Sequence, residues 1–415
     1  EIYTLSLHDA LPISLAANLS GSVFIDIISD DSHIHKPSVE CVQIAKGNKC
    51  YVASGMELSV FSGAKISLNG YMLQRIYYIF EALGIDTGNM TSEFDISLAM
   101  YLLNPNKKQE ELVFDDEPAR QLSMFASAED TYKNCGRKFA KMTALKKSLT
   151  ADLKRDDLLK LYTDIELPLP KILASMESAG IRVDSDALLE AGAALGAKSE
   201  LLAKEIYEAA GEEFNINSPK QLGIVLFEKL KMPGAKKTKT GYATNADVLD
   251  KLAPDYPIVQ KILDYRTYSK LKSTYVDGML PLIDEEGKVH PHYRQNVTAT
   301  GRLSCTEPNL QNIPVRDDEG RKLRKLFSAD SPEYILIGAD YSQIELRVMA
   351  HMSGDEGLIA AFSGGHDIHK ETASRVFNVP LDEVSPAMRS NAKAVNFGIV
   401  YGISAFGLSE DLNIS

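Results

Sequence analysis

The spacing of apolar and polar positions divides the first third of the chain into short strands and amphipathic helices. Apolar runs rich in β-branched residues are typical of strands, and apolar residues three and four apart are typical of helices. Strands are expected at 22–28, 39–45 and 48–54, and helices at 72–85 and 93–104. The polar stretch 104–120 predicts a loop, and 121–147 predicts a helix that becomes basic towards its end. This alternation predicts a compact α/β domain.

The middle of the chain has a predominantly helical pattern. A long helical stretch over 151–180 is interrupted by two prolines and is ended by Gly180. Ser218 before Pro219 is typical of a helix start, because serine caps the first turn and proline tolerates its first position. Further helices are expected within 185–230 and at 245–252 and 257–280, and a strand at 181–184. The basic stretch 229–239, broken by Gly and Pro, predicts a loop.

An unbroken apolar run over 334–339 ends at a single carboxylate, Asp340. A short apolar run without alternation predicts a strand buried on both faces. A carboxylate at the end of such a strand can hold a hard cation at the rim of a sheet. Ser342 and Glu345 have the spacing of a capping box, which predicts a helix start. The apolar face of that helix is expected to contain Ile344, Val348 and Met349.

The last helices are expected at 355–363, 367–377 and 386–401, the final one beginning with Ser385 and Pro386 and ending at Gly402. That final helix contains two cations and two aromatic residues spaced four apart, and they span roughly 120° of one face. They are Arg389, Lys393, Phe397 and Tyr401. Such cations can hold a polyphosphate while the aromatics meet a sugar or base; alternatively, they are a solvated basic turn and core aromatics. Gly398 in mid-helix favours a need for close approach or bending.

Composition excludes several classes of protein. The 415 residues are enough for two or three domains, and no window has the roughly 18 apolar residues of a membrane span. The four cysteines form no CxxC pair, which argues against a zinc ribbon or a secreted disulfide scaffold and favours a reducing cytoplasm. The net charge of −12 argues weakly against nucleic acid, because a basic groove can coexist with acidic outer surfaces.

Four stretches together resemble the family A DNA polymerases. Residues 389–402, RSNAKAVNFGIVYG, resemble motif B of that family, and 340–347, DYSQIELR, resemble motif A. TATGRLSCTEPNLQNIPVR, 298–316, looks like the segment that lies along the primer–template, and LDYRTYSKLKSTY, 263–275, is similar to the thumb helix. The resemblance covers the chain from about 164 to its end, and more weakly back to about 21. Several long motifs in the family's order make chance resemblance an inadequate explanation.

The resemblance implies an α/β and α+β multidomain fold, in which an RNase H-like exonuclease domain precedes a partial right-hand polymerase domain. The exonuclease-like domain is expected at 15–150 and the incomplete polymerase domain at 151–415. Within the latter, the thumb is expected at about 185–290, the palm at 291–350 and the fingers at 351–415. Residues 1–14 resemble a translated adapter and are excluded as a non-native leader. A monomer in a bacterial cytoplasm, associated with the nucleoid and not with membrane, is expected.

The resemblance also implies partners and site residues. The partners would be primer–template DNA and deoxynucleoside triphosphates, and the cofactor would be two Mg²⁺ ions. Asp340 would bridge the ions with the Tyr341 carbonyl as a further ligand, and Lys393 would also protonate the leaving group. Residues near the incoming nucleotide would be Gln343, Glu345, His369, Arg389, Lys393, Phe397 and Tyr401. Residues at the DNA would be Arg266, Lys270, Arg302, Asn309, Gln311 and Asn312.

Each role has a simpler competitor. Glu345, expected to select deoxynucleotides by occluding a ribose 2′-hydroxyl together with Tyr401, could be only a capping-box partner. The basic stretch 229–239 could be a solvated loop instead of a phosphate contact, and Asp340 could be a helix-start acid. His351, His366 and His369 could suggest zinc, but no thiol or fixed fourth ligand accompanies them.

The chain departs from the family pattern in the exonuclease-like domain. The D-x-E motif is represented by Asp26 and Ile28, and N-x3-D by Asn69 and Leu73, so that two acids are absent. Asp95 and Asp130 remain as candidates from later motifs. Isolated acids cannot hold a metal pair. We therefore expect no proofreading and a domain retained as a structural platform.

The second departure concerns the polymerase domain. The family's hairpin with a His-Asp-Glu motif, which supplies the second metal-binding carboxylate, does not occur in the 415 residues. The resemblance therefore predicts that this polypeptide is inactive although its parent is a polymerase. Two alternatives are a non-catalytic DNA-binding fragment and a 3′–5′ exonuclease that uses the N-terminal domain.

Overall fold

The computed structural model contains two compact units, Glu1–Ile335 and Leu336–Ser415. It describes residues 3–4, 20–30, 37–47, 49–54, 58–106, 128–235, 237–238, 241–315, 318–365, 367–400, 402–404 and 407–408. The boundary between the units falls inside the range expected for a palm. No helix among these residues is long and apolar enough to cross a membrane.

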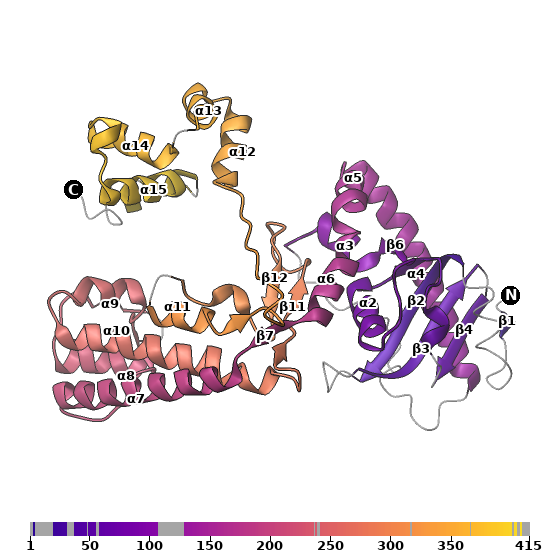
Figure 1. Ribbon diagram of the computed structural model, residues 1–415, viewed down its shortest axis with the longest axis horizontal. Helices are drawn as coiled ribbons and strands as arrows, with labels where there is room; N and C mark the ends of the chain where they lie inside the picture. The colour runs from indigo at the N-terminus through magenta and orange to yellow at the C-terminus, as the bar shows by residue number, and fades with distance from the viewer. Residues whose placement is uncertain are drawn as a thin grey trace. The chain divides into compact units, whose positions relative to one another are not determined.

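The first unit begins with a six-stranded mixed sheet (Figure 1). Its strands are β1 (Tyr3–Thr4), β2 (Gly21–Asp30), β3 (Ser38–Lys46), β4 (Lys49–Ser54), β5 (Ile66–Gly70) and β6 (Thr91–Asp95). Their order is β1-β4-β3-β2-β5-β6. Strands β2, β3 and β4 form an antiparallel meander, and β5 and β6 extend it in parallel from β2. Two residues of the excluded leader thus form an edge strand, parallel to β4.

Helices cover both faces of this sheet. The alternation in β2 directs Val23, Ile25 and Ile27 into a core with α2 (Leu73–Ala82) and α6 (Leu169–Ala179). Phe24 and Ile28 point to the opposite face, into a second core with α3 (Ile96–Leu103) and α4 (Ala128–Arg155). The predicted α/β architecture of this region is therefore found as three layers, with helices on both faces of a mixed sheet.

Two strands of the sheet differ from the sequence predictions. Strand β5 was not predicted, because its five residues include Asn69 and Gly70 and its pairing with β2 is long-range. Strand β6 ends inside the stretch 93–104 that was predicted to be entirely helical. Helix α3 begins only at Ile96. The Asp95 side chain caps it by accepting hydrogen bonds from N–H groups of its first turn.

The helices of the middle region agree closely with prediction. Gly180 ends α6 with φ of 62°, and β7 (Ile181–Val183) follows. The Ser218 hydroxyl caps α8, accepting from the Gln221 N–H at 3.4 Å. The helices are α5 (Leu159–Leu161), α7 (Ser185–Ala210), α8 (Pro219–Gly223), α9 (Ala246–Leu252) and α10 (Pro257–Lys270), with π-helical turns at Tyr162–Glu166, Ile224–Lys229 and Leu271–Asp277. One apolar core joins the second half of α7 to α8, α9 and α10. A second core joins the first half of α7 to the segment after α10.

Short strands and a hairpin follow. Strand β7 pairs with β10 (Lys288–Val289) and β13 (Phe327–Ser328), and β11 (His292–Arg294) pairs with β12 (Ser304–Thr306). A 3₁₀ turn at Leu310–Asn312 and α11 (Asp318–Arg324) complete the unit. Part of the basic loop 229–239 pairs as β8 (Lys237–Thr238) with β9 (Gly241–Tyr242).

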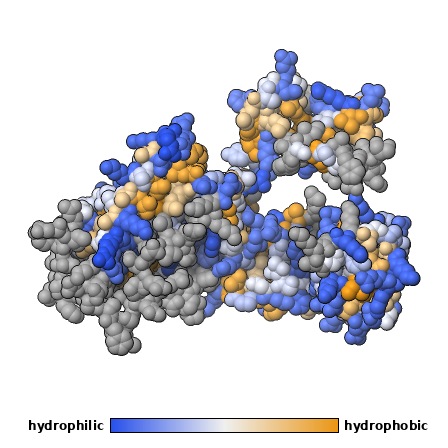
Figure 2. All heavy atoms as spheres, turned by 180° about the vertical axis from the view of Figure 1, so that it is seen from behind, coloured by the Kyte–Doolittle hydropathy of each residue, from blue (hydrophilic) through white to orange (hydrophobic). Residues whose placement is uncertain are grey.

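The second unit consists of α12 (Ile344–Ser353), α13 (Glu356–Ser363), α14 (Ile368–Phe377) and α15 (Pro386–Val400). The three last helices confirm the prediction. Leu346, Ala361 and Ile368 form its small core. Figure 2 shows apolar residues at the surface of this unit.

The predicted strand at 334–339 is wrong for the described chain. The segment forms neither helix nor strand, it pairs with no strand among the described residues, and Ile337 is 83% exposed. The capping box is also wrong: Gln343 precedes α12 with φ of 53°, and no side chain caps the helix. Ile344 and Val348 are exposed, because α12 buries Leu346 and Ala350 instead. An apolar run predicts burial only where other segments cover it, and α12 has apolar residues on more than one face.

Candidate nucleotide and nucleic-acid interface

Helices α14 and α15 pack against each other and bring predicted nucleotide-binding residues together. Asp367 caps α14 by accepting from the N–H groups of His369 and Lys370 at 3.0 and 3.3 Å. Ser385 caps α15, accepting from the Met388 N–H at 3.2 Å, as the Ser385-Pro386 sequence predicts. Both helix starts are therefore fixed locally, and positions along them are set by the helical repeat.

His369 is the buried centre of this arrangement, with 2% exposure. Its Nδ1 lies 3.0 Å from the amide nitrogen of Asn396 on α15, and the Asn396 oxygen accepts from the Thr372 hydroxyl at 3.1 Å. Burial lowers the pKa of His369, Asp367 raises it, and the positive charges of Arg389 and Lys393 lower it; the net shift is downwards from 6.5. The ring is therefore neutral at pH 7 and locked between the two helices.

Arg389 reaches from α15 to the cap of α14. Its Nε donates to Oδ2 of Asp367 at 2.6 Å. Burial alone would raise the pKa of Asp367, but the bonds from Arg389 and from the Lys370 N–H lower it, so the net pKa lies below its usual value. Asp367 therefore orients the guanidinium of Arg389, whose side chain is 44% exposed and accessible to an anion.

Acidification below pH 6.5, the usual pKa of histidine, is expected to destabilise the unit Leu336–Ser415. Because the folded-state pKa of His369 is lowered, the unfolded chain binds the proton first as the pH falls, so stability present above 6.5 is lost below it. Thermal unfolding from about pH 8 to about pH 5 would measure this, with His369→Gln as the control. Equal pH dependence in both proteins would contradict the prediction.

The structure brings only part of the predicted nucleotide site together. His369, Arg389 and Lys393 share the α14–α15 site. Asp340, Tyr341, Gln343 and Glu345 lie before or at the start of α12, the helix that packs against α13. The Phe397 side chain, Tyr401 and His366 lie outside the described residues.

Sequence reasoning missed Asp367 and Asn396. Asn396 lies seven residues after Arg389 and three after Lys393, so the helical repeat could have placed it on their side of α15. Gly398 has a packing explanation instead of a functional one: a Cβ there would lie 2.8 Å from Cγ2 of Ile403, whose N–H bonds back to the Gly398 carbonyl at 2.8 Å.

Predicted DNA contacts gather along the segment that contains β11 and β12. Arg302 is exposed in the connection between these strands, and its carbonyl accepts from the Thr298 hydroxyl at 2.7 Å. Asn309 accepts from the Gln311 N–H at 3.1 Å, and the Gln311 amide donates to the Leu303 carbonyl at 3.1 Å. The Asn312 carbonyl accepts from the Tyr275 hydroxyl. These exposed amides thus also shape the segment that presents them.

Arg266 does not fit its predicted role as a phosphate contact. Its guanidinium is half-buried and donates to the carbonyls of Thr244 at 2.6 Å and Ile216 at 3.2 Å. Burial lowers the pKa of Arg266, and each of its three guanidinium nitrogens donates to one of these carbonyls. Arg266 therefore ties α10 to the segments before α8 and α9. Lys270, one turn later, is exposed.

The N-terminal sheet uses its remaining acids internally. Asp26 forms an ion pair with Lys138 of α4. Leu73, at the position of an absent acid, is fully buried. Asp95 is also buried and accepts from the N–H groups of Leu73 and Ser97 at 2.7 and 2.9 Å, which corrects its interpretation as a leftover metal ligand. The Asp130 side chain lies outside the described residues.

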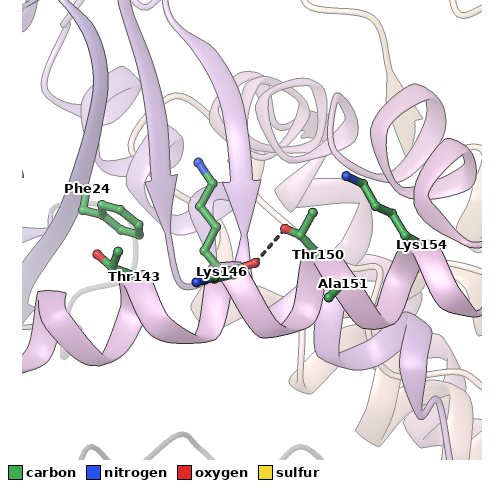
Figure 3. A pocket seen from close by; sticks show the side chains of 7 residues that line it. Phe24, Thr143, Lys146, Thr150, Ala151 and Lys154 are labelled. Carbon is green, nitrogen blue, oxygen red and sulfur yellow. Dashed lines mark hydrogen bonds between the residues drawn. The ribbon is translucent and has the colours of Figure 1, made fainter.

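An open cavity of about 540 Å³ lies between α4 and β2 (Figure 3). Lys146, Thr150 and Lys154 project from the same side of α4 beside it. Lys146 is committed to the sheet, because its ammonium donates to Asn69 and Glu93, both at 2.6 Å. No residue predicted for nucleotide or DNA binding lines this cavity.

The sequence model of DNA polymerase family A matches residues 185–415, which is more than half of the chain and includes α14, α15 and the β11–β12 segment. The chain belongs to DNA polymerase family A. This membership confirms the resemblance of the four motifs, since all of them lie within the matched residues.

Individual members of family A extend the similarity beyond the matched span. DNA polymerase I of Bacillus subtilis is 48% identical over 339 residues, which cover 78% of this chain and 38% of the relative. DNA polymerase I of Lactococcus lactis subsp. lactis is 43% identical over 419 aligned positions, covering 97% and 47%. The chain therefore spans less than half the length of these relatives.

A solved family A structure supports the architecture. It is the POL domain of Pol1 from M. smegmatis in complex with DNA primer-template and dNTP, with a TM-score of 0.83 and 33% identity. The similarity covers 99% of this chain and 73% of that one. The mixed α/β architecture of the whole chain is thus that of a family A polymerase structure.

Proposed function

We propose that this chain is part of an enzyme that adds deoxynucleotides to the 3′-hydroxyl of a primer annealed to a DNA template, in replication and repair. The observation that carries the proposal is the meeting of His369, Arg389 and Lys393 between α14 and α15. A neutral buried imidazole beside two cations, one of them oriented by Asp367, is suited to a triphosphate. Family membership gives that anion site its substrate class.

The phosphate-binding residues have distinct tasks in this proposal. Arg389 would hold non-reacting phosphate oxygens through its oriented fork, and Lys393 would neutralise the charge that develops on the departing pyrophosphate and supply its proton. His369, expected from the resemblance to contact the triphosphate, is buried against Asn396, so it would act by fixing the spacing of the helices. Gln343 would lie near the phosphates, Phe397 against the sugar, and Glu345 with Tyr401 where a 2′-hydroxyl would project.

Asp340 and the Tyr341 carbonyl would hold Mg²⁺, because hard oxygen donors shared with substrate phosphates are the ligands this ion takes. Among the described residues, no group of three or more His, Cys, Asp or Glu side chains surrounds a possible ion position. The donors therefore fit part of one ion's shell and do not by themselves fit two ions. When bound, divalent ions would activate the primer hydroxyl and neutralise the leaving group.

Duplex DNA would lie against the β11–β12 segment and α10. Arg302 would reach acceptors in the minor groove that all base pairs share, and Asn309, Gln311 and Asn312 would line the same duplex. Lys270, exposed near the end of α10, would contact a phosphate, while Arg266 would only support the helix. The basic loop 229–239 would add non-specific contacts.

The sheet domain would be an RNase H-like exonuclease domain without proofreading. Its order β4-β3-β2-β5-β6, with an antiparallel meander extended by parallel strands, supports that fold assignment. The pairing of Asp26 with Lys138 and the internal use of Asp95 support the loss of metal-dependent cleavage. The domain would act as a platform.

We also propose that the isolated 415-residue chain binds DNA, as a monomer, but extends primers only at trace rates. Asp340 stands at the end of a segment that is exposed and pairs with no strand among the described residues. A carboxylate on such a segment is not held in the geometry that catalysis needs.

Fluorescence anisotropy with a labelled primer–template would test DNA binding. Lys270→Ala is expected to weaken binding about two- to tenfold and to reduce the salt slope by about one, because one phosphate contact is lost.

Arg266→Ala is expected to lower the melting temperature because two buried carbonyls lose their donors. No measurable affinity for primer–template in the unmodified chain would overturn the proposed function.

A further inference from the structure

The connection between β11 and β12 is held from the sheet domain. The Tyr101 hydroxyl, on α3, donates to the Thr298 carbonyl at 2.7 Å across 197 residues of sequence. The Thr298 hydroxyl in turn donates to the Arg302 carbonyl at 2.7 Å. Burial, and then the charge of Glu166, raise the pKa of Tyr101, so its hydroxyl remains a donor at neutral pH. A chain of two hydrogen bonds therefore runs from the sheet domain to Arg302.

A second clamp holds the strand that leads into this connection. The Gln74 amide, on α2, donates to the Tyr293 carbonyl at 2.6 Å and to the Glu177 carboxylate at 2.7 Å. The same Glu177 oxygen accepts from the Tyr293 N–H at 2.7 Å. Glu177 is 3% exposed, so these bonds replace water around a buried carboxylate. The backbone of β11 is thus fixed at Tyr293, and Tyr101 holds the connection that follows this strand.

The connection needs such support because it has little structure of its own. Residues between β11 and β12 make no ladder bonds, and Gly301 has φ of 77°. Ordering a free loop at the moment of binding costs affinity, whereas a loop already ordered in the unbound protein does not pay that cost again. A hydroxyl that fixes Thr298 therefore reduces the conformational entropy that the loop must lose when DNA binds.

We propose that Tyr101 is a positioning residue for DNA binding: the sheet domain, through Tyr101 and Thr298, holds the 298–302 loop so that Arg302 is presented to the duplex. The inference rests on the proposed function, because it assumes that Arg302 contacts DNA. It gives the sheet domain a task that needs no nuclease chemistry.

Tyr101→Phe tests the proposal, with primer–template affinity measured by fluorescence anisotropy. The substitution removes one hydroxyl and leaves the ring, and it is expected to weaken binding about three- to tenfold. Tyr77→Phe is the matched control: that hydroxyl is also in the sheet domain, but its bond, to Ser92 at 3.2 Å, stays within that domain. Thr298→Val, which breaks the second bond of the chain, is expected to weaken binding similarly.

A double-mutant cycle with Arg302→Ala separates positioning from general destabilisation. If Tyr101 acts through Arg302, Tyr101→Phe has no further effect in the Arg302→Ala background. Two results would overturn the inference while leaving the proposed function intact: no effect of Tyr101→Phe although Arg302→Ala weakens binding, or an equal effect in both backgrounds. If the Arg302→Ala protein binds DNA normally, Arg302 does not contact DNA and the inference fails.

Discussion

Replacement of Asp95 by alanine is expected to unfold the sheet domain locally, at a cost of about 3 kcal/mol or more. This buried carboxylate accepts from the Leu73 N–H at 2.7 Å, the Ser97 N–H at 2.9 Å and the Ser97 hydroxyl at 2.7 Å. It stands at the first turns of α2 and α3, where the helix dipoles favour a negative charge. Alanine would leave these donors, and the N–H groups of Met72 and Leu98 at 3.3 and 3.4 Å, without this acceptor. Hydrogen exchange at the amides of β6 and α3 measures the loss.

The matched control is Asp184→Ala. Asp184 also caps a helix, α7, but it is exposed, and the one bond that its carboxylate accepts among the described residues is from the Ala187 N–H at 3.0 Å, so about 1 kcal/mol is expected. Two results together would instead identify Asp95 as a leftover metal ligand. The unmodified chain would show a metal-dependent 3′ degradation, and Asp95→Ala would abolish it while keeping its amide protection. These results would also refute the absence of proofreading.

The helices of this fold can be predicted from sequence because their determinants are local. The Ser385-Pro386 start of α15 and the Gly180 end of α6 depend on neighbours a few residues away. Strands depend on distant partners. Strand β5, with Asn69 and Gly70, is stabilised by pairing with β2, which no local pattern reveals. The apolar run 334–339 shows the converse, since its sequence favours a strand but no described segment covers it.

The candidate site follows the same division. Arg389 and Lys393 could be placed on one helix face from spacing alone, and His369 entered only through the resemblance to family A. The role of Asp367 as the partner of Arg389 depends on how α14 meets α15 and could not be read from either helix. Arginine commonly contacts phosphate, but the guanidinium of Arg266 already donates to the carbonyls of Ile216 and Thr244. Residue type and motif therefore predict which side chains could act, and packing decides which are available.

Replacement of Lys393 by alanine is expected to weaken binding of a deoxynucleoside triphosphate about 10- to 150-fold, because a hydrogen bond to a charged group contributes about 1.5–3 kcal/mol. Lys393 is exposed on α15, one turn after Arg389, and its charge already acts on His369. Titration of the chain, with primer–template present, by a fluorescent triphosphate measures the dissociation constant. Lys393→Arg keeps the charge and should recover part of the affinity.

Arg375→Ala is the matched control for this charge removal. Arg375 is also exposed and lies on α14, where it faces Glu371 at 3.6 Å. If the triphosphate responds only to the overall field, both substitutions will weaken binding equally, and the effect will fade as salt screens it. A specific site requires a loss for Lys393→Ala that persists at high salt, together with an unchanged affinity for Arg375→Ala. An equal loss in the two variants would show that α14 and α15 form a general basic surface instead of a triphosphate site.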